Sequence, residues 1–222
     1  MLFDGKHRPK GLEFASCRVC NEATRKDELV VSLLSRFYPQ QVKTIQLRDV
    51  KKLFRDAERH NPGLLAEMQI LEQDKLHQKY AQNNLPSSVG FLRVDGPIVS
   101  NAVARFAAKL GFALHCEHTG TPVSQNGGVA VTWYSNVNIV TGDRMPNRLL
   151  SMLGPGQTLE MGSFRVPDQF RYSSLATDNN KMSGHLAVFR ESFAIEAVVK
   201  NSKDHGQLTL PNTFFQVGCF LS

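Results

Sequence analysis

The stretch that decides the fold is residues 96–116, which read GPIVSNAVARFAAKLGFALHC. From Ile98 to Cys116, apolar residues fall on nearly all sides of a helix, which is typical of a helix buried in the centre of a domain. Gly96-Pro97 comes before this segment, and Gly120 and Pro122 close it. The sequence therefore predicts one long central helix that other elements must cover.

Beyond Pro122 the spacing of apolar residues changes from near four toward two, which favours strands. Strands are predicted at residues 129–134, 158–166, 170–176, 185–190, 193–199 and 214–220. The runs 186–189 and 193–199 flank Arg190-Glu191-Ser192 as a hairpin candidate, and a short helix is predicted at 147–153. Residues 89–222 are therefore predicted to form an α+β domain, with the buried helix against an antiparallel sheet.

Three more helices are predicted before this domain. The first runs from Asn21 and stops before Pro39, the second covers residues 47–59 and the third covers residues 62–81. A polar, proline-containing cluster at 83–88 marks a boundary. We expect three parts: a small knuckle, which is a tight turn with two cysteines, and its helix in residues 1–38, a helical arm in 39–84, and the α+β domain in 89–222.

Composition and charge bound the class of protein. The chain has 222 residues, of which 41% are hydrophobic and 21% charged, as in a globular protein that is neither disordered nor fibrous. It has no apolar run long enough for a membrane span, and Asp4, Lys6, Arg8 and Lys10 occupy the place of a signal peptide's apolar core. We expect a cytoplasmic protein without membrane partners.

The basic residues are concentrated in one part of the chain. Residues 1–60 hold 13 Lys and Arg against 8 Asp and Glu, within a net charge of +6 for the whole chain. Such an excess suits DNA, because Lys and Arg gain affinity by displacing counterions from phosphates. It is equally typical of a solvated face. The candidates for nucleic-acid contacts are Arg18, Arg25, Lys26, Lys51, Lys52 and Arg55.

Cys17 and Cys20 are separated by two residues and are followed by Asn21 and a polar helix start. Two thiolates in such a turn can face one tetrahedral Zn²⁺. They are only half of a structural zinc site, so His7, the larger domain or a partner chain must supply further ligands.

The stretch from Gly11 to Asn21, with the polar helix after it, resembles the second half of the HNH endonuclease motif, which has a ββα-metal fold. The resemblance implies that Cys17 and Cys20 are structural zinc ligands and that Asn21 faces a catalytic divalent ion such as Mg²⁺. It further implies metal-dependent hydrolysis of phosphodiester bonds in DNA. The motif's histidine-bearing half would lie at or before Met1, so we expect weak or no activity, with His7 the nearby substitute as ligand or base.

Two other functions stay open at this point. The protein could bind nucleic acid without cutting it. Alternatively, it could be a structural or protein-interaction module in which the knuckle only stabilises the N-terminus. His115, Cys116, Glu117 and His118 are also potential metal ligands, but polar residues near a helix end are more often caps or surface contacts. The sequence does not indicate an oligomeric state.

Overall fold

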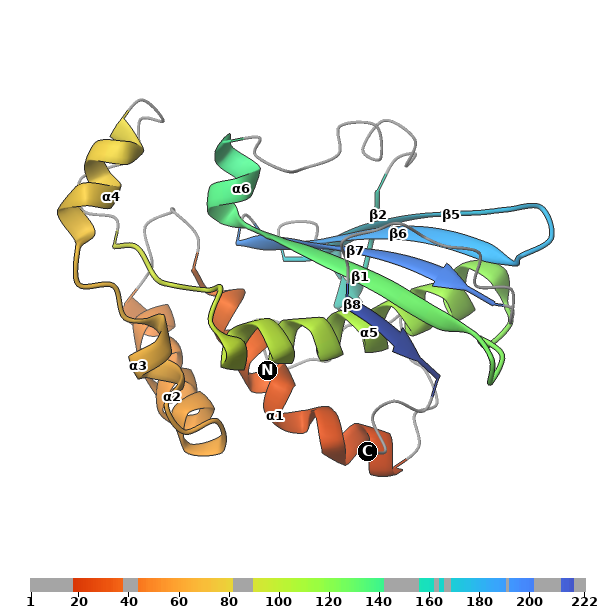
Figure 1. Ribbon diagram of the computed structural model, residues 1–222, viewed down its shortest axis with the longest axis horizontal. Coiled ribbons are helices and arrows are strands. Elements are labelled where there is room, and N and C mark those ends of the chain that lie inside the picture. The colour runs from red at the N-terminus through yellow and green to blue at the C-terminus, as the bar shows by residue number, and fades with distance from the viewer. Residues whose placement is uncertain are drawn as a thin grey trace.

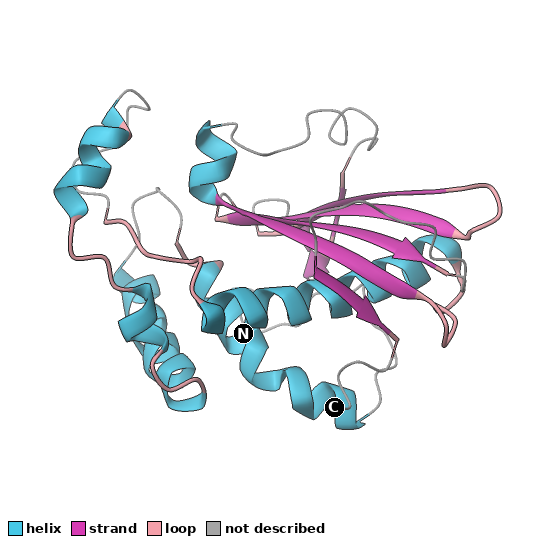
Figure 2. Ribbon diagram, viewed as in Figure 1, coloured by secondary structure: helices cyan, strands magenta, loops and turns pink. Residues whose placement is uncertain are grey.

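The structure, a computed structural model, describes residues 18–37, 44–81, 90–141, 156–161, 164–165, 169–190, 192–201 and 213–217. Within these residues, a long helix lies along one face of a six-stranded antiparallel sheet (Figures 1 and 2). The predicted α+β class, with a helix packed against an antiparallel sheet, is confirmed.

The sheet has the strand order β2-β5-β6-β7-β1-β8. Its strands are β1 (Gly128–Ser135), β2 (Gln157–Thr158), β5 (Arg171–Ala176), β6 (Met182–Phe189), β7 (Phe193–Lys200) and β8 (Thr213–Gln216). The predicted hairpin is β6–β7, closed by the pair Phe189 and Phe193, and β1 pairs along the whole length of β7. Buried residues occur on both faces of β6 and β7, which is why these strands read as nearly continuous apolar runs.

The central helix is α5 (Pro97–Thr119), with Pro97 in its first turn and Gly120 at its end in the left-handed conformation, φ 70°. Glu67 caps it from outside, since its carboxylate accepts hydrogen bonds of 2.9 Å from both the Ile98 and Val99 N–H groups. A negative group at this helix terminus is stabilising because the terminal N–H groups have no partner within the helix.

One hydrophobic cluster joins the sheet, α5 and the N-terminal helices. Phe189 is at its centre, 4.6 Å from Phe193, 4.9 Å from Phe170 and 5.9 Å from Phe106 between ring centroids. The same cluster contains Val30, Val31, Leu33 and Leu34 of the first helix and Ala57, Leu64 and Met68 from the next two. The core therefore draws on residues from all three predicted segments of the chain.

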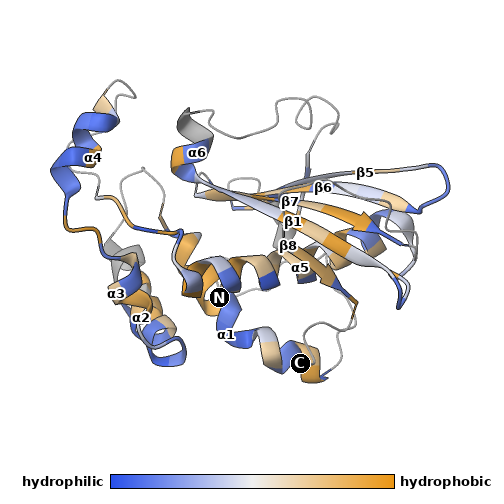
Figure 3. Cartoon of the chain, in the orientation of Figure 1, coloured by the Kyte–Doolittle hydropathy of each residue, from blue (hydrophilic) through white to orange (hydrophobic). Residues whose placement is uncertain are grey.

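Helix α1 lies along the side of α5 that faces away from the sheet, and the helices that follow α1 lie toward the N-terminal end of α5 (Figure 1). These N-terminal helices are α1 (Arg18–Leu34), α2 (Thr44–His60), α3 (Leu64–Met68) and α4 (Gln73–Lys79). In Figure 3, hydrophilic and hydrophobic segments alternate along α1 and α2, as expected of helices with one buried and one exposed face. Among the described residues, no helix has the length and apolarity required to cross a bilayer.

The single helix predicted for residues 62–81 is wrong, because the chain leaves the helical conformation between α3 and α4. Gln69 is extended, with φ −72° and ψ 134°. The break is held by the segment before α5: the Arg93 N–H donates to the Met68 carbonyl, and the Gln73 amide exchanges two hydrogen bonds with the Phe91 backbone. Tertiary hydrogen bonds here replace the helical ones that local propensity favours.

The single strand predicted for residues 158–166 is also wrong. After Thr158 the chain leaves the main sheet, and β3 (Glu160–Met161) pairs with β4 (Phe164–Arg165) in a separate two-stranded sheet. Residues 162 and 163, between these two strands, lie outside the described residues.

The remaining differences concern helix positions. Helix α6 (Asn136–Thr141) directly follows β1 and was not predicted, whereas the predicted helix at 147–153 and the boundary at 83–88 lie outside the described residues. Helix α1 begins at Arg18, three residues before the predicted start at Asn21. Cys20 and Asn21 therefore lie inside a helix, not in a turn before one.

Candidate nucleic-acid interface

Helix α1 presents one charged face to solvent and one polar face to α5. On the solvent side Arg25 and Lys26 are exposed, and neither forms an ion pair within the described parts of the chain. Arg18 differs, since its guanidinium is 2.8 Å from the Glu22 carboxylate in an exposed pair one turn apart. Such a pair contributes little stability and can open to meet another anion.

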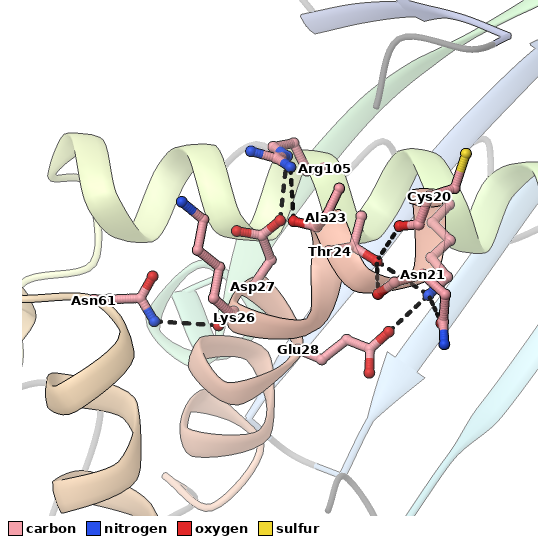
Figure 4. Close-up of polar contacts among 10 residues, drawn as sticks. Cys20, Asn21, Ala23, Thr24, Lys26, Asp27, Glu28, Asn61 and Arg105 are labelled. Atoms are coloured by element: carbon pink, nitrogen blue, oxygen red, sulfur yellow. Dashed lines mark hydrogen bonds and ion pairs between the residues drawn. The ribbon is translucent and has the colours of Figure 1, made fainter. Parts of the chain in front are cut away.

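Asn21, Thr24 and Glu28 of α1 form a polar cluster (Figure 4) that a lysine of α5 joins to that helix. The Lys109 ammonium donates to the Asn21 side-chain oxygen at 3.0 Å, the Thr24 hydroxyl at 3.1 Å and the Glu28 carboxylate at 2.7 Å. The predicted catalytic residue Asn21 is therefore bound to a cation of this chain. Its side-chain oxygen would have to leave Lys109 before it could coordinate a metal ion.

One turn away, Asp27 and Arg105 form a second link between these helices (Figure 4). The Asp27 carboxylate is 3.2 Å from the Arg105 Nε, and another Arg105 nitrogen donates to the Ala23 carbonyl at 2.9 Å. Asp27 is only 3% exposed, and within the described part of the chain its Oδ2 accepts no hydrogen bond. Burial is the largest influence on this carboxyl and outweighs the attraction of Arg105, so the pKa of Asp27 rises from 3.8 to about 6.

Helix α2 carries the larger group of exposed cations. Lys51, Lys52 and Arg55 are all exposed and form no ion pair within the described residues, as the sequence-based prediction requires of nucleic-acid contacts. Arg59 is exposed on the same helix, four residues beyond Arg55, although it was not among the predicted contacts. The interval of four residues places Lys51, Arg55 and Arg59 along one side of the helix.

Specific contacts fix α2 beside α1. The Asn61 side-chain amide lies at the end of α2 and donates to the Lys26 carbonyl of α1 and to the Ala57 carbonyl of its own helix, both at 3.2 Å. Phe37 and Phe54 pack with ring centroids 5.5 Å apart. These contacts join the two helices that carry the exposed cations, and we define the basic surface as Arg25, Lys26, Lys51, Lys52, Arg55 and Arg59.

The predicted zinc site can be placed only in part. Cys17 and His7 lie outside the described residues, and Cys20 is half-buried on the first turn of α1 against the core. Among the residues that the structure describes, no group of three or more His, Cys, Asp and Glu side chains is placed to hold a metal ion. The pairing of Cys17 with Cys20 around Zn²⁺ stays a prediction.

The prediction that His115 is a cap or surface residue is wrong. His115 is 0% exposed, and its Nδ1 forms a hydrogen bond of 2.7 Å with the hydroxyl of Ser183, which lies on the sheet. Glu117 and His118 are exposed, as expected for the end of a helix. No sequence signal could identify this contact, because its two residues are far apart in the chain.

Comparison with protein-family models, with curated proteins and with solved structures found no match. The functional argument therefore depends on the geometry of these residues alone.

Proposed function

We propose that this protein binds nucleic acid, with the basic surface of α1 and α2 in contact with the phosphate backbone. The observation that carries the proposal is that this surface consists of exposed cations with no ion-pair partner among the described residues. Cations that serve only solubility are usually interspersed with acidic residues, whereas unpaired cations on one surface can each displace a counterion from a phosphate.

The spacing on α2 suits a phosphate backbone. A helix rises about 1.5 Å per residue, so Lys51, Arg55 and Arg59 are separated by steps of about 6 Å along the helix axis. One strand of duplex DNA places a phosphate every ~3.4 Å of its axis. Long, flexible Lys and Arg side chains at this spacing can each reach a separate phosphate.

The two acidic side chains of α2 that the structure describes are less accessible than its basic ones. Asp56 and Glu58 are half-buried, while Lys51, Lys52, Arg55 and Arg59 are exposed. The Glu58 carboxylate accepts hydrogen bonds from the Gly63 and Leu65 N–H groups at 2.9 and 2.8 Å, which lower its pKa. The Glu58 carboxylate is therefore hydrogen-bonded to the turn that follows α2 and does not pair with a cation of the basic surface.

The contacts of Asn21 favour binding over cleavage. In the HNH-like hypothesis Asn21 faces a catalytic divalent ion, but here the Lys109 ammonium holds its side-chain oxygen. A positively charged group at this distance opposes the approach of a divalent cation. We therefore place a non-enzymatic interaction with DNA above phosphodiester hydrolysis.

Binding of a labelled duplex of random sequence at low salt tests the proposal. Lys51→Gln with Arg55→Gln removes two cations of the basic surface. The matched control, Arg171→Gln with Lys181→Gln, removes one exposed cation of β5 and one of the bend before β6. We expect the first variant to bind at least tenfold more weakly and the control to bind within twofold of the parent. Equal affinity of the two variants would contradict the proposal.

A second measurement separates binding from cleavage. Supercoiled plasmid is incubated with the protein and Mg²⁺ or Mn²⁺, and we expect salt-sensitive retention without nicking. Nicking that Asn21→Ala abolishes would instead support the HNH-like hypothesis.

A further inference from the structure

Four polar side chains form a continuous chain of hydrogen bonds between α5 and the sheet. The Ser174 hydroxyl is 2.8 Å from His185 Nδ1, His185 Nε2 is 2.7 Å from the Ser183 hydroxyl, and that hydroxyl is 2.7 Å from His115 Nδ1. Both rings are 0% exposed and Ser183 is 2% exposed. This His–Ser chain joins three elements, β5, β6 and α5, at the end of α5 remote from Pro97.

The surroundings of the chain are apolar. Ser183 and His185 occupy alternate positions of β6, and the next two residues of that series are Ala187 and Phe189, which belong to the main core cluster beneath α5. Ile195, Ala197 and Val199 of β7 belong to the same cluster. The burial excludes an encounter of Ser183 with a substrate, so the serine and histidine pair is not a nucleophile and base.

The hydrogen bonds of the chain determine where the ring protons lie. His115 Nε2 is buried and has no hydrogen-bond partner among the described residues. A buried N–H without an acceptor is costlier than a lone pair without a donor, so the Nε2 position of His115 carries no proton. His115 Nδ1–H then donates to Ser183, the Ser183 hydroxyl donates to His185 Nε2, and His185 Nδ1–H donates to Ser174.

We propose that this His–Ser chain is an acid-operated latch, which holds the C-terminal half of α5 on the sheet while both rings are neutral and releases it when either is protonated. A proton added to His115 Nε2 would point an N–H into apolar surroundings without an acceptor. A proton added to His185 Nε2 would make both of its nitrogens donors, so the Ser183 hydroxyl would have to turn away. Either change leaves a buried positive charge.

The charged and titratable groups around the chain do not compensate such a charge. Helix α5 contributes Glu117 and His118, both exposed, and β5 contributes Tyr172, whose pKa is raised by burial and by Glu117. On β7 the residues packed under α5 are apolar. No carboxylate forms a hydrogen bond or an ion pair with either ring in the described part of the chain.

The titration behaviour agrees with this geometry. Burial lowers the pKa of His115, and it lowers the pKa of His185 from 6.5 to about 3, with smaller contributions from neighbouring histidines. The folded protein thus binds fewer protons than the opened one below pH 6.5. The opening equilibrium constant therefore rises by up to tenfold per pH unit for each ring, and by about 16-fold for His185 alone between pH 6.5 and 5.

The test uses the wild-type chain first. Two-bond ¹H–¹⁵N spectra of the imidazole rings between pH 7.5 and 5 should show both buried rings neutral, with the proton on Nδ1. Protonation of either ring in the native state above pH 6 would overturn the latch. This measurement requires no substitution and so does not depend on a variant that folds.

Native-state hydrogen exchange locates the opening. After correction for intrinsic rates, amides of residues 112–119 should open more often at pH 5 than those of residues 99–106, and this opening should be insensitive to low urea. Equal opening and equal urea dependence in both halves would show that the rings titrate only with global unfolding, which contradicts the latch. His185→Gln should remove up to tenfold per pH unit of the dependence, whereas the exposed-ring control His118→Gln should retain it.

Discussion

Replacing Asp27 with asparagine should make the protein more stable at pH 7 and leave its stability nearly unchanged at pH 4. Asp27 is buried between α1 and α5, where its pKa is about 6, well above its ordinary value of 3.8. A carboxyl with a raised folded pKa contributes stability that is fully present below the unfolded pKa and is lost as the pH rises through the folded one. The loss therefore falls between pH 4 and 6.

The size of the effect follows from these two pKa values. Each pH unit between them corresponds to about 1.36 kcal/mol, so ionisation of Asp27 costs the folded state up to about 3 kcal/mol above pH 6. Asparagine is neutral at every pH and has nearly the same shape. Relative to the parent, Asp27→Asn should gain about 1–3 kcal/mol at pH 7, less any attraction to Arg105 that the amide cannot replace.

Urea unfolding of both proteins at pH 4, 5, 6 and 7 measures this difference. Contributions of the buried histidines cancel in the comparison because both proteins contain them. Glu22→Gln is the control, since the same chemical change on the exposed face of α1 should alter the free energy of unfolding by less than ~1 kcal/mol at each pH. A loss of stability in Asp27→Asn at pH 7 would mean that the ion pair with Arg105 outweighs burial, and would refute the reasoning.

Two further substitutions test how α5 is held. Gly111→Ala should destabilise the protein by about 1 kcal/mol by urea unfolding, because the new Cβ would lie 2.8 Å from Ala197 Cβ and 2.9 Å from Val129 Cγ2. Overpacking costs about 1–3 kcal/mol and outweighs the gain in helix propensity of ~1 kcal/mol that alanine brings. Asn101→Ala is the control, because on the exposed side of α5 the gain in propensity meets no overpacking. Equal stability of the two variants would contradict this account. Glu67→Ala should cost about 1–2 kcal/mol by removing the cap of α5, and Glu67→Gln, which keeps one acceptor, should cost less; an unchanged midpoint for both would contradict it.

The sequence predicts those parts of the fold whose signal is local. The central helix and the strands β1, β5, β6 and β7 follow from the period of apolar residues, and their observed bounds lie close to the predicted ones. The break between α3 and α4 could not be predicted, because its cause is hydrogen bonding by Phe91 and Arg93, about twenty residues further along the chain.

In the candidate site, too, features with a local sequence signal could be predicted, and contacts between distant residues could not. Exposed cations on α2 follow from helix periodicity, since Lys51, Lys52 and Arg55 lie opposite its apolar residues. The contact between Asn21 and Lys109 joins residues 88 positions apart, so no local pattern contains it. The His–Ser chain likewise depends on the packing of α5 against two strands, and only the topology brings its four residues together.

The most direct test of the proposed function is the salt dependence of DNA binding. The logarithm of the association constant should fall linearly with the logarithm of salt concentration, with a slope of about −0.9 for each phosphate contact. Six cations on the basic surface set a limit near −5 for the parent protein, and Lys51→Gln with Arg55→Gln should make the slope less steep by about 2. A slope near zero, or one that this double substitution leaves unchanged, would contradict the assignment of α1 and α2 as a nucleic-acid interface.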